Sequence, residues 1–190
     1  ADFGGEGERI LSMVDGVILL VDSSEGAMPQ TKFVTGKALK LGLRPIVVVN
    51  KIDRSDARVQ EVLDEVFDLF VTLEANDEQL DFPVLYASGR NGYASDDADA
   101  REGTLQPLFE KIVEHVPPPA LDQDAPFSFL VTLLDRDNFL GRILTGRVQS
   151  GTVKLNQPIH ALDAEGKVIE TGRASKIMTF QGLERVPTDE

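Results

Sequence analysis

The chain has 190 residues, 42% of them hydrophobic, and a formal net charge of −13. A surface this acidic repels phosphate, so we predict no DNA partner and expect any RNA contact to depend on local basic residues. Because the chain lacks cysteine, a leader-like segment and an apolar run long enough to span a bilayer, we expect no disulfides, no thiolate metal site, no membrane partner and a cytoplasmic location.

The first third of the chain has the pattern of a helix, a strand and a second helix. Apolar residues recur at helical spacing up to Val14, and an unbroken apolar run at 17–21 then ends at Asp22. Such a run is typical of a parallel strand that is buried on both faces. Pro29 favours the start of the next helix and Gly42 its end.

A second buried strand is predicted at 45–49, and it ends in Asn50-Lys51-Ile52-Asp53. Polar residues that end such a strand lie at its carboxyl end, where open α/β sheets bind ligands. The Asp53 carboxylate can accept hydrogen bonds from both the ring N–H and the exocyclic amine of guanine, whereas adenine would leave this charge unpaired. The stem of Lys51 can lie along the purine, and Asn50 can tie the loop to its neighbours. This motif therefore predicts guanine recognition.

The pattern of strand followed by helix continues to a proline-rich linker. Apolar residues at 59–70 follow one helical face, 74–81 reads as an acidic connector, 82–87 as a third strand and 105–116 as another helix after a polar loop. Alternating strands and helices predict a parallel sheet with right-handed crossovers.

Beyond the prolines at 117–119, short strand-like runs separated by turns predict an antiparallel β-barrel or sandwich. We therefore expect an α/β fold of two parts, a partial GTPase-type parallel sheet with flanking helices at 1–117 and a partial barrel domain at 118–190.

Several of these motifs resemble the BipA/TypA family of translational GTPases, which are ribosome-associated relatives of elongation factors Tu and G. The resemblance runs along essentially the whole chain, and the motif Phe3-Gly4-Gly5-Glu6 favours this family over elongation factor G. The matching segments are 1–6, 8–11, 28–31, 50–54, 64–70, 80–84 and 86–88.

The resemblance implies a GTPase that binds GTP and GDP with Mg²⁺. It assigns guanine binding to Asn50, Lys51, Ile52, Asp53, Ser88 and Gly89. In this family a backbone N–H of the Ser88–Gly89 loop meets the guanine carbonyl oxygen. Gly89 stands where the family usually has Ala, and Arg90 departs from the usual aliphatic residue, which leaves its role open.

For the second part, the resemblance implies a translation-factor barrel that faces RNA of the small ribosomal subunit. Its RNA-facing candidates are Arg142, Arg147, Arg173 and Lys176. Asn156 stands where relatives often have Gly, and Asn tolerates the positive φ that such a turn requires.

The hydrolytic machinery of the family has no counterpart in this sequence. No G-x-x-x-x-G-K-[ST] motif occurs in it, so the phosphate cradle, the Mg²⁺ ligands and the catalytic residue are expected upstream of Ala1. We expect no catalytic or metal-binding residue in this chain. The resemblance implies no catalytic role for Asp2 or Glu6. We interpret His115 and His160 as structural residues.

We therefore interpret the chain as the guanine-specific half of a GTPase site joined to part of a barrel, cut at both ends. The strand at 17–21 would then expose an apolar edge, which suggests self-association. Two alternatives stay open: a ribosome- or RNA-binding module that holds no nucleotide, and another translational GTPase of the elongation factor G type.

Overall fold

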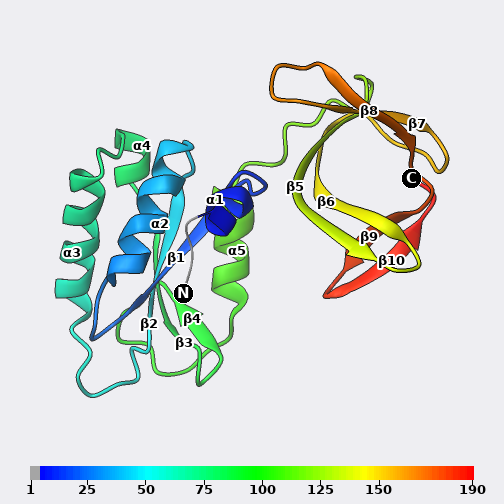
Figure 1. Cartoon of the computed structure of the whole chain (residues 1–190). Coiled ribbons are helices and arrows are strands. Elements are labelled where there is room, and N and C mark those ends of the chain that lie inside the picture. The colour runs from blue at the N-terminus through cyan, green and yellow to red at the C-terminus, as the bar shows by residue number, and fades with distance from the viewer. Residues whose placement is uncertain (1–4) are drawn as a thin grey trace. The chain divides into compact units, whose positions relative to one another are not determined.

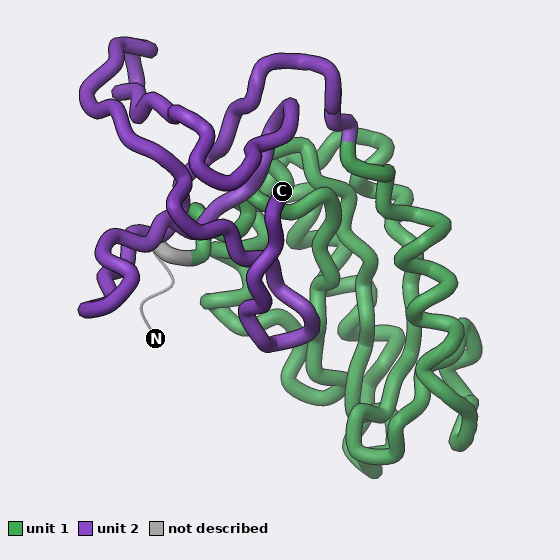
Figure 2. Tube along the Cα trace, turned by 90° about the vertical axis from the view of Figure 1, so that its right-hand side faces the viewer, with its two compact units in different colours: residues 1–119 green, residues 120–190 purple. Residues whose placement is uncertain are grey.

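The computed structural model describes residues 5–190, which form two compact units that divide between Pro119 and Ala120 (Figures 1 and 2). The expectations for Asp2 and for the side chain of Glu6 lie outside what it describes. Each unit is considered by itself.

The first unit is built on a four-stranded sheet in the order β1-β2-β3-β4. Its strands are β1 (Val17–Asp22), β2 (Pro45–Asn50), β3 (Val84–Ser88) and β4 (Tyr93–Ser95). The first three are parallel, and β4 pairs antiparallel with β3. The parallel α/β sheet expected from the sequence is therefore confirmed.

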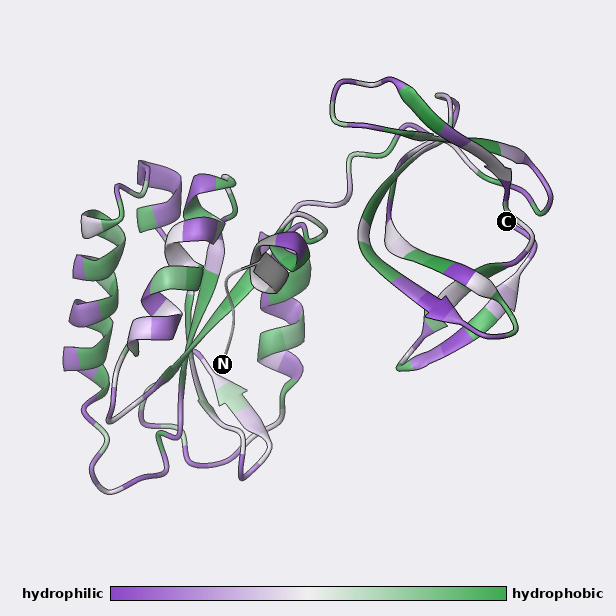
Figure 3. Cartoon of the chain, viewed as in Figure 1, coloured by the Kyte–Doolittle hydropathy of each residue, from purple (hydrophilic) through white to green (hydrophobic). Residues whose placement is uncertain are grey.

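Strand β2 carries the core because it is buried on both faces. Val47 and Val49 face α2 (Pro29–Lys40) and α3 (Val59–Thr72), while Ile46 and Val48 pack against α5 (Gln106–His115). Alternate residues of a strand point to opposite faces, so an unbroken run of apolar residues fills both layers. Figure 3 shows the resulting hydrophobic strands between helices that are hydrophilic on one side.

The helices begin and end where local chemistry allows. Pro29 starts α2, where a missing N–H costs nothing, and Gly42 follows its end with φ 77°. In α3 the buried residues Val62, Val66 and Phe70 are four positions apart and so share one face. A further short helix, α1 (Gly5–Leu11), precedes β1.

Two segments differ from the expectation of irregular loops. The acidic connector contains helix α4 (Asp77–Leu80), which Asn76 and Gln79 cap reciprocally. The buried Gln79 amide also donates to the carbonyl oxygens of Leu39 and Leu43, 3.0 and 2.9 Å away, and so satisfies the end of α2. The polar loop after Arg90 contains β4. This strand places the Tyr93 side chain in the core, and the Tyr93 hydroxyl lies 3.1 Å from the Ala100 carbonyl oxygen.

The second unit consists of three antiparallel hairpins, and each forms a separate two-stranded sheet. Their strands are β5 (Ser128–Asp137), β6 (Gly141–Ser150), β7 (Pro158–Leu162), β8 (Val168–Arg173), β9 (Ile177–Gln181) and β10 (Glu184–Thr188). Asn156 has φ 63°, as expected for a residue at a glycine-like turn position.

The hairpins do not close into a barrel within residues 120–190, so the antiparallel β-structure is confirmed and the barrel itself stays a prediction. Neighbouring hairpins share no strand pairing that would join them into one sheet within residues 120–190. None of these residues is buried, and large apolar side chains such as Phe139 and Leu183 are fully exposed. The antiparallel pattern is confirmed, but alternation alone does not show that hairpins close on one another.

We predict that Phe70→Ala lowers the free energy of unfolding of the first unit by about 3–5 kcal/mol. Phe70 is fully buried and its ring lies 4.9 Å from that of Phe82, so truncation leaves a cavity. The matched control is Phe67→Ala on the exposed side of the same helix, where a loss below about 1 kcal/mol is expected. Urea unfolding followed by circular dichroism measures both, and equal losses would contradict this account of the core.

Candidate functional site

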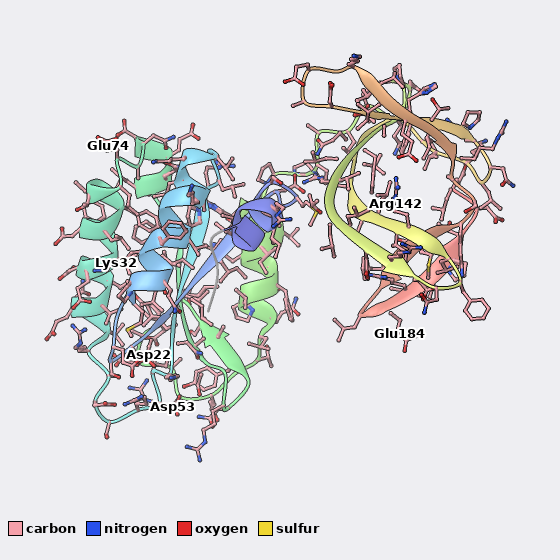
Figure 4. All side chains as sticks on the ribbon, in the orientation of Figure 1. Asp22, Lys32, Asp53, Glu74, Arg142 and Glu184 are labelled. Atoms are coloured by element: carbon pink, nitrogen blue, oxygen red, sulfur yellow. The ribbon has the colours of Figure 1, made fainter. Side chains whose placement is uncertain are left out.

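Polar side chains gather where the three parallel strands of the first unit end. Asp22 ends β1, Asn50 ends β2 and Ser88 ends β3. Asp22 lies opposite Asn50 in the register, and Asn50 lies opposite Ala87. Figure 4 shows Asp22 and Asp53 at this end of the unit, with Glu74 at the other. The carboxyl edge of the sheet therefore brings together the segments that the sequence identified.

Asn50 ties two loops together through one oxygen. Its Oδ1 accepts hydrogen bonds from the backbone N–H of Lys51 at 2.8 Å and of Gly89 at 2.9 Å. The expectation that Asn50 links its loop to a neighbour is thus confirmed. A β-carbon at Gly89 would lie 3.6 Å from the Asn50 amide, which is an ordinary contact.

Lys51 is held in a left-handed conformation with φ 65°, which is unfavourable for a residue with a β-carbon. Its carbonyl oxygen accepts from the buried Ser23 hydroxyl at 2.9 Å and from the Arg54 N–H at 3.1 Å. Its ammonium nitrogen lies 2.6 Å from Oδ2 of Asp22. The surrounding contacts therefore fix both the backbone and the tip of this side chain.

The Asp22 carboxylate is almost enclosed and fully engaged. Its Oδ1 accepts from the N–H and hydroxyl of Ser24, at 2.9 and 3.0 Å, and from the N–H of Glu25 at 3.2 Å. Burial alone would raise the pKa of Asp22, but the hydrogen bonds from Lys51, Ser24 and Glu25 outweigh it and lower the pKa well below its usual range. The carboxylate is therefore charged at neutral pH.

The last two residues of the motif point in opposite directions. Ile52 is buried and its N–H donates to the Ala87 carbonyl oxygen at 3.2 Å, which pins the loop to β3. Asp53 is exposed, and a hydrogen bond with the Ser88 side chain lowers its pKa, with a smaller contribution from the positive charge of Arg90. An ionised carboxylate therefore faces solvent beside the Ser88–Gly89 loop.

Sequence reasoning missed the support that Ser23 and Arg58 supply. Arg58 donates through its backbone N–H to the Ser23 carbonyl oxygen at 2.8 Å, and through Nε to that of Ser24 at 2.7 Å. It also forms an ion pair with Glu65 of α3. The abrupt end of the first apolar run at Asp22 was the available signal for the β1 loop.

The four cations expected to face RNA all belong to the second unit. Arg142 pairs with Glu170 at 2.6 Å, and Arg173 donates to the Asn156 carbonyl oxygen at 2.9 Å. Arg147 lies on β6. Hydrogen bonds from the backbone N–H groups of Leu140 and Phe139 lower the pKa of Asp137, with a smaller contribution from the positive charge of Lys176.

The described part of the chain has no cluster of side chains suited to a metal ion. Residues 5–190 contain no group of three or more His, Cys, Asp or Glu side chains placed to hold a metal ion. His115 ends α5, and His160 lies on β7 with Nδ1 3.1 Å from the Thr171 hydroxyl. None of the helices within 5–190 has the length and apolar character to cross a bilayer.

Known proteins resemble this chain in sequence along its whole length. Residues 1–118 match the family described as Elongation factor Tu GTP binding domain. The whole chain is similar to proteins named "Large ribosomal subunit assembly factor BipA", with 51% identity to that of Escherichia coli (strain K12), 52% to that of Bacillus subtilis (strain 168) and 51% to that of Synechocystis sp..

All of this chain is covered in these three alignments, but it spans only 31–32% of the length of the relatives. The chain therefore belongs to the family of the elongation factor Tu GTP-binding domain, and the resemblance to the BipA/TypA translational GTPases is confirmed.

Proposed function

We propose that this chain forms the guanine-specific half of the nucleotide site in a ribosome-associated GTPase. The observation that supports it best is the placement of Asn50, Lys51 and Asp53 at the carboxyl edge of the sheet, beside the Ser88–Gly89 loop. Asp53 would accept from the two donors of guanine, and the Lys51 stem would cover one face of the base. The Gly89 N–H already donates to Asn50, so the guanine carbonyl oxygen would share this donor.

The chain's own residues fit the base but not the rest of the nucleotide. The described residues offer no cluster for Mg²⁺, and the sequence holds no phosphate-binding loop. We therefore propose that the base is recognised here, that other parts of the protein hold the phosphates and Mg²⁺, and that hydrolysis takes place there.

For the second unit we propose a translation-factor domain 2, with residues 118–190 as its part in this chain and 1–117 as part of the GTP-binding domain. Antiparallel hairpins with large exposed apolar side chains support a β-structure that packs against further chain. Arg142, Arg147, Arg173 and Lys176 would face ribosomal RNA. The printed name of the relatives refers to assembly of the large subunit, so contact with small-subunit RNA in the cytoplasm is our proposal.

We also propose that the edge of β1 supports self-association of the isolated chain. Ile18 and Leu20 are 44% and 58% exposed, and a groove of about 420 Å³ runs along β1 between α1 and α2. An apolar strand with one unpaired side favours pairing with another chain. Light scattering at high concentration tests this, and a monomer throughout would contradict it.

We predict that Asp53→Asn in the full-length protein weakens GDP binding by about 100-fold and shifts the preference towards xanthine nucleotides. The Asn amide can donate to the xanthine carbonyl oxygen, whereas it cannot accept both guanine donors. Titration of GDP, GTP, ATP and xanthosine diphosphate measures the change. If the wild-type protein bound GDP and ATP equally, and the variant gained nothing for xanthine, the guanine assignment would be wrong.

We predict that Gly89→Ala keeps guanine binding. The free energy of unfolding should stay the same or rise by about 0.4–1 kcal/mol. The added β-carbon fits beside Asn50 and restricts only the unfolded chain. The matched control is Gly26→Ala, which should lose about 1 kcal/mol or more because Gly26 has φ 74° and a β-carbon there would meet Glu65. Thermal unfolding and GDP titration check both, and a loss of binding in Gly89→Ala would count against the observed loop geometry.

A further inference from the structure

We propose that Asp22 is a positioning residue of the guanine site, which holds the Lys51 side chain in the orientation that covers the base. The inference deepens the proposed function and rests on it. Asp22 lies outside the Asn50–Asp53 motif and is contributed by a different strand, β1.

The first support is the geometry of the pair. Oδ2 of Asp22 is buried and lies 2.6 Å from the Lys51 ammonium nitrogen, so the two opposite charges form a close ion pair. The Asp22 side chain is 12% exposed and that of Lys51 52% exposed. A shielded carboxylate thus binds the end of a side chain whose stem remains open to solvent and to a ligand.

The second support is that the other end of Lys51 is also fixed. Its N–H donates to Asn50 and its carbonyl oxygen accepts from Ser23, so the backbone is held in its left-handed conformation. A lysine stem has four rotatable bonds and loses considerable entropy when it is ordered on a ligand. With both ends restrained before the base arrives, less of this entropy remains to be lost on binding.

The third support is that Asp22 divides its two oxygens between two tasks. Oδ1 accepts from Ser24 and Glu25 and shapes the turn after β1, while Oδ2 faces Lys51. Asp22→Asn keeps one acceptor oxygen for the turn, removes the charge and replaces the oxygen that faces Lys51 by an NH2 group, which cannot accept from the ammonium. This substitution therefore separates the contact with Lys51 from the fold of the loop.

The test is a double-mutant cycle in the full-length protein, read out by GDP affinity. Asp22→Asn is combined with Lys51→Met, which keeps an unbranched stem without the ammonium. We expect Asp22→Asn to weaken GDP binding when Lys51 is present. The loss of affinity should be about fivefold larger there than in the Lys51→Met background. The change in GDP affinity that Asp22→Asn causes in the Lys51→Met background includes any direct repulsion between Asp22 and the phosphates. Subtracting this change leaves only the part that depends on Lys51.

Asp56→Asn is the matched control. Asp56 carries the same charge in the same loop but pairs with Arg54 at 2.6 Å. We expect no coupling between Asp56→Asn and Lys51→Met. The rate of Lys51 acylation without nucleotide is a second readout, because the pairing of its ammonium with the accepting Asp22 carboxylate raises the pKa of Lys51 and slows reaction of the amine. Acylation should be faster in Asp22→Asn and unchanged in Asp56→Asn.

The outcomes separate this inference from the function on which it rests. If the wild-type protein prefers GDP to ATP but Asp22→Asn weakens binding equally in both backgrounds, or not at all, the positioning role is overturned and the guanine site stands. Unchanged acylation in Asp22→Asn would likewise overturn it. If the wild-type protein does not distinguish guanine from adenine, both proposals fall.

Discussion

The burial of β2 on both faces is the constraint on which the rest of the first unit depends. A strand enclosed by helices on each side must be apolar along its length, and polar side chains can follow only where it ends. The motif that begins at Asn50 occupies this position. Because the neighbouring strands are parallel, their own polar ends reach the same edge of the sheet.

That edge is held together by polar contacts between loops that are distant in the sequence. Asn50 links the β2 loop to Gly89, Ser23 links it to β1, and Asp22 binds the end of Lys51. Each contact uses a group that would otherwise be unsatisfied or unfavourably placed at the boundary of the core. At this edge the Asp53 carboxylate is exposed to solvent, and its lowered pKa keeps it ionised.

The two units differ in how they are stabilised. The first has a continuous core on both faces of its sheet, and its central side chains are fully enclosed. The second has strand pairing within each hairpin but no buried side chain among residues 120–190. Isolated two-stranded hairpins are marginally stable in water, so the large apolar surface of this unit favours contact with further structure.

The sequence by itself determined the three parallel strands, the main helices and the position of the Asn50–Asp53 motif, because apolar periodicity and residue chemistry are local properties. Only the tertiary structure decided which distant groups meet. The capping of α2 by Gln79, the burial of Tyr93, and the contacts of Ser23 and Asp22 with Lys51 join residues separated along the chain, and no local pattern encodes these distances. The open arrangement of the hairpins has the same origin, because alternation specifies a strand's two faces but not the partner that covers them.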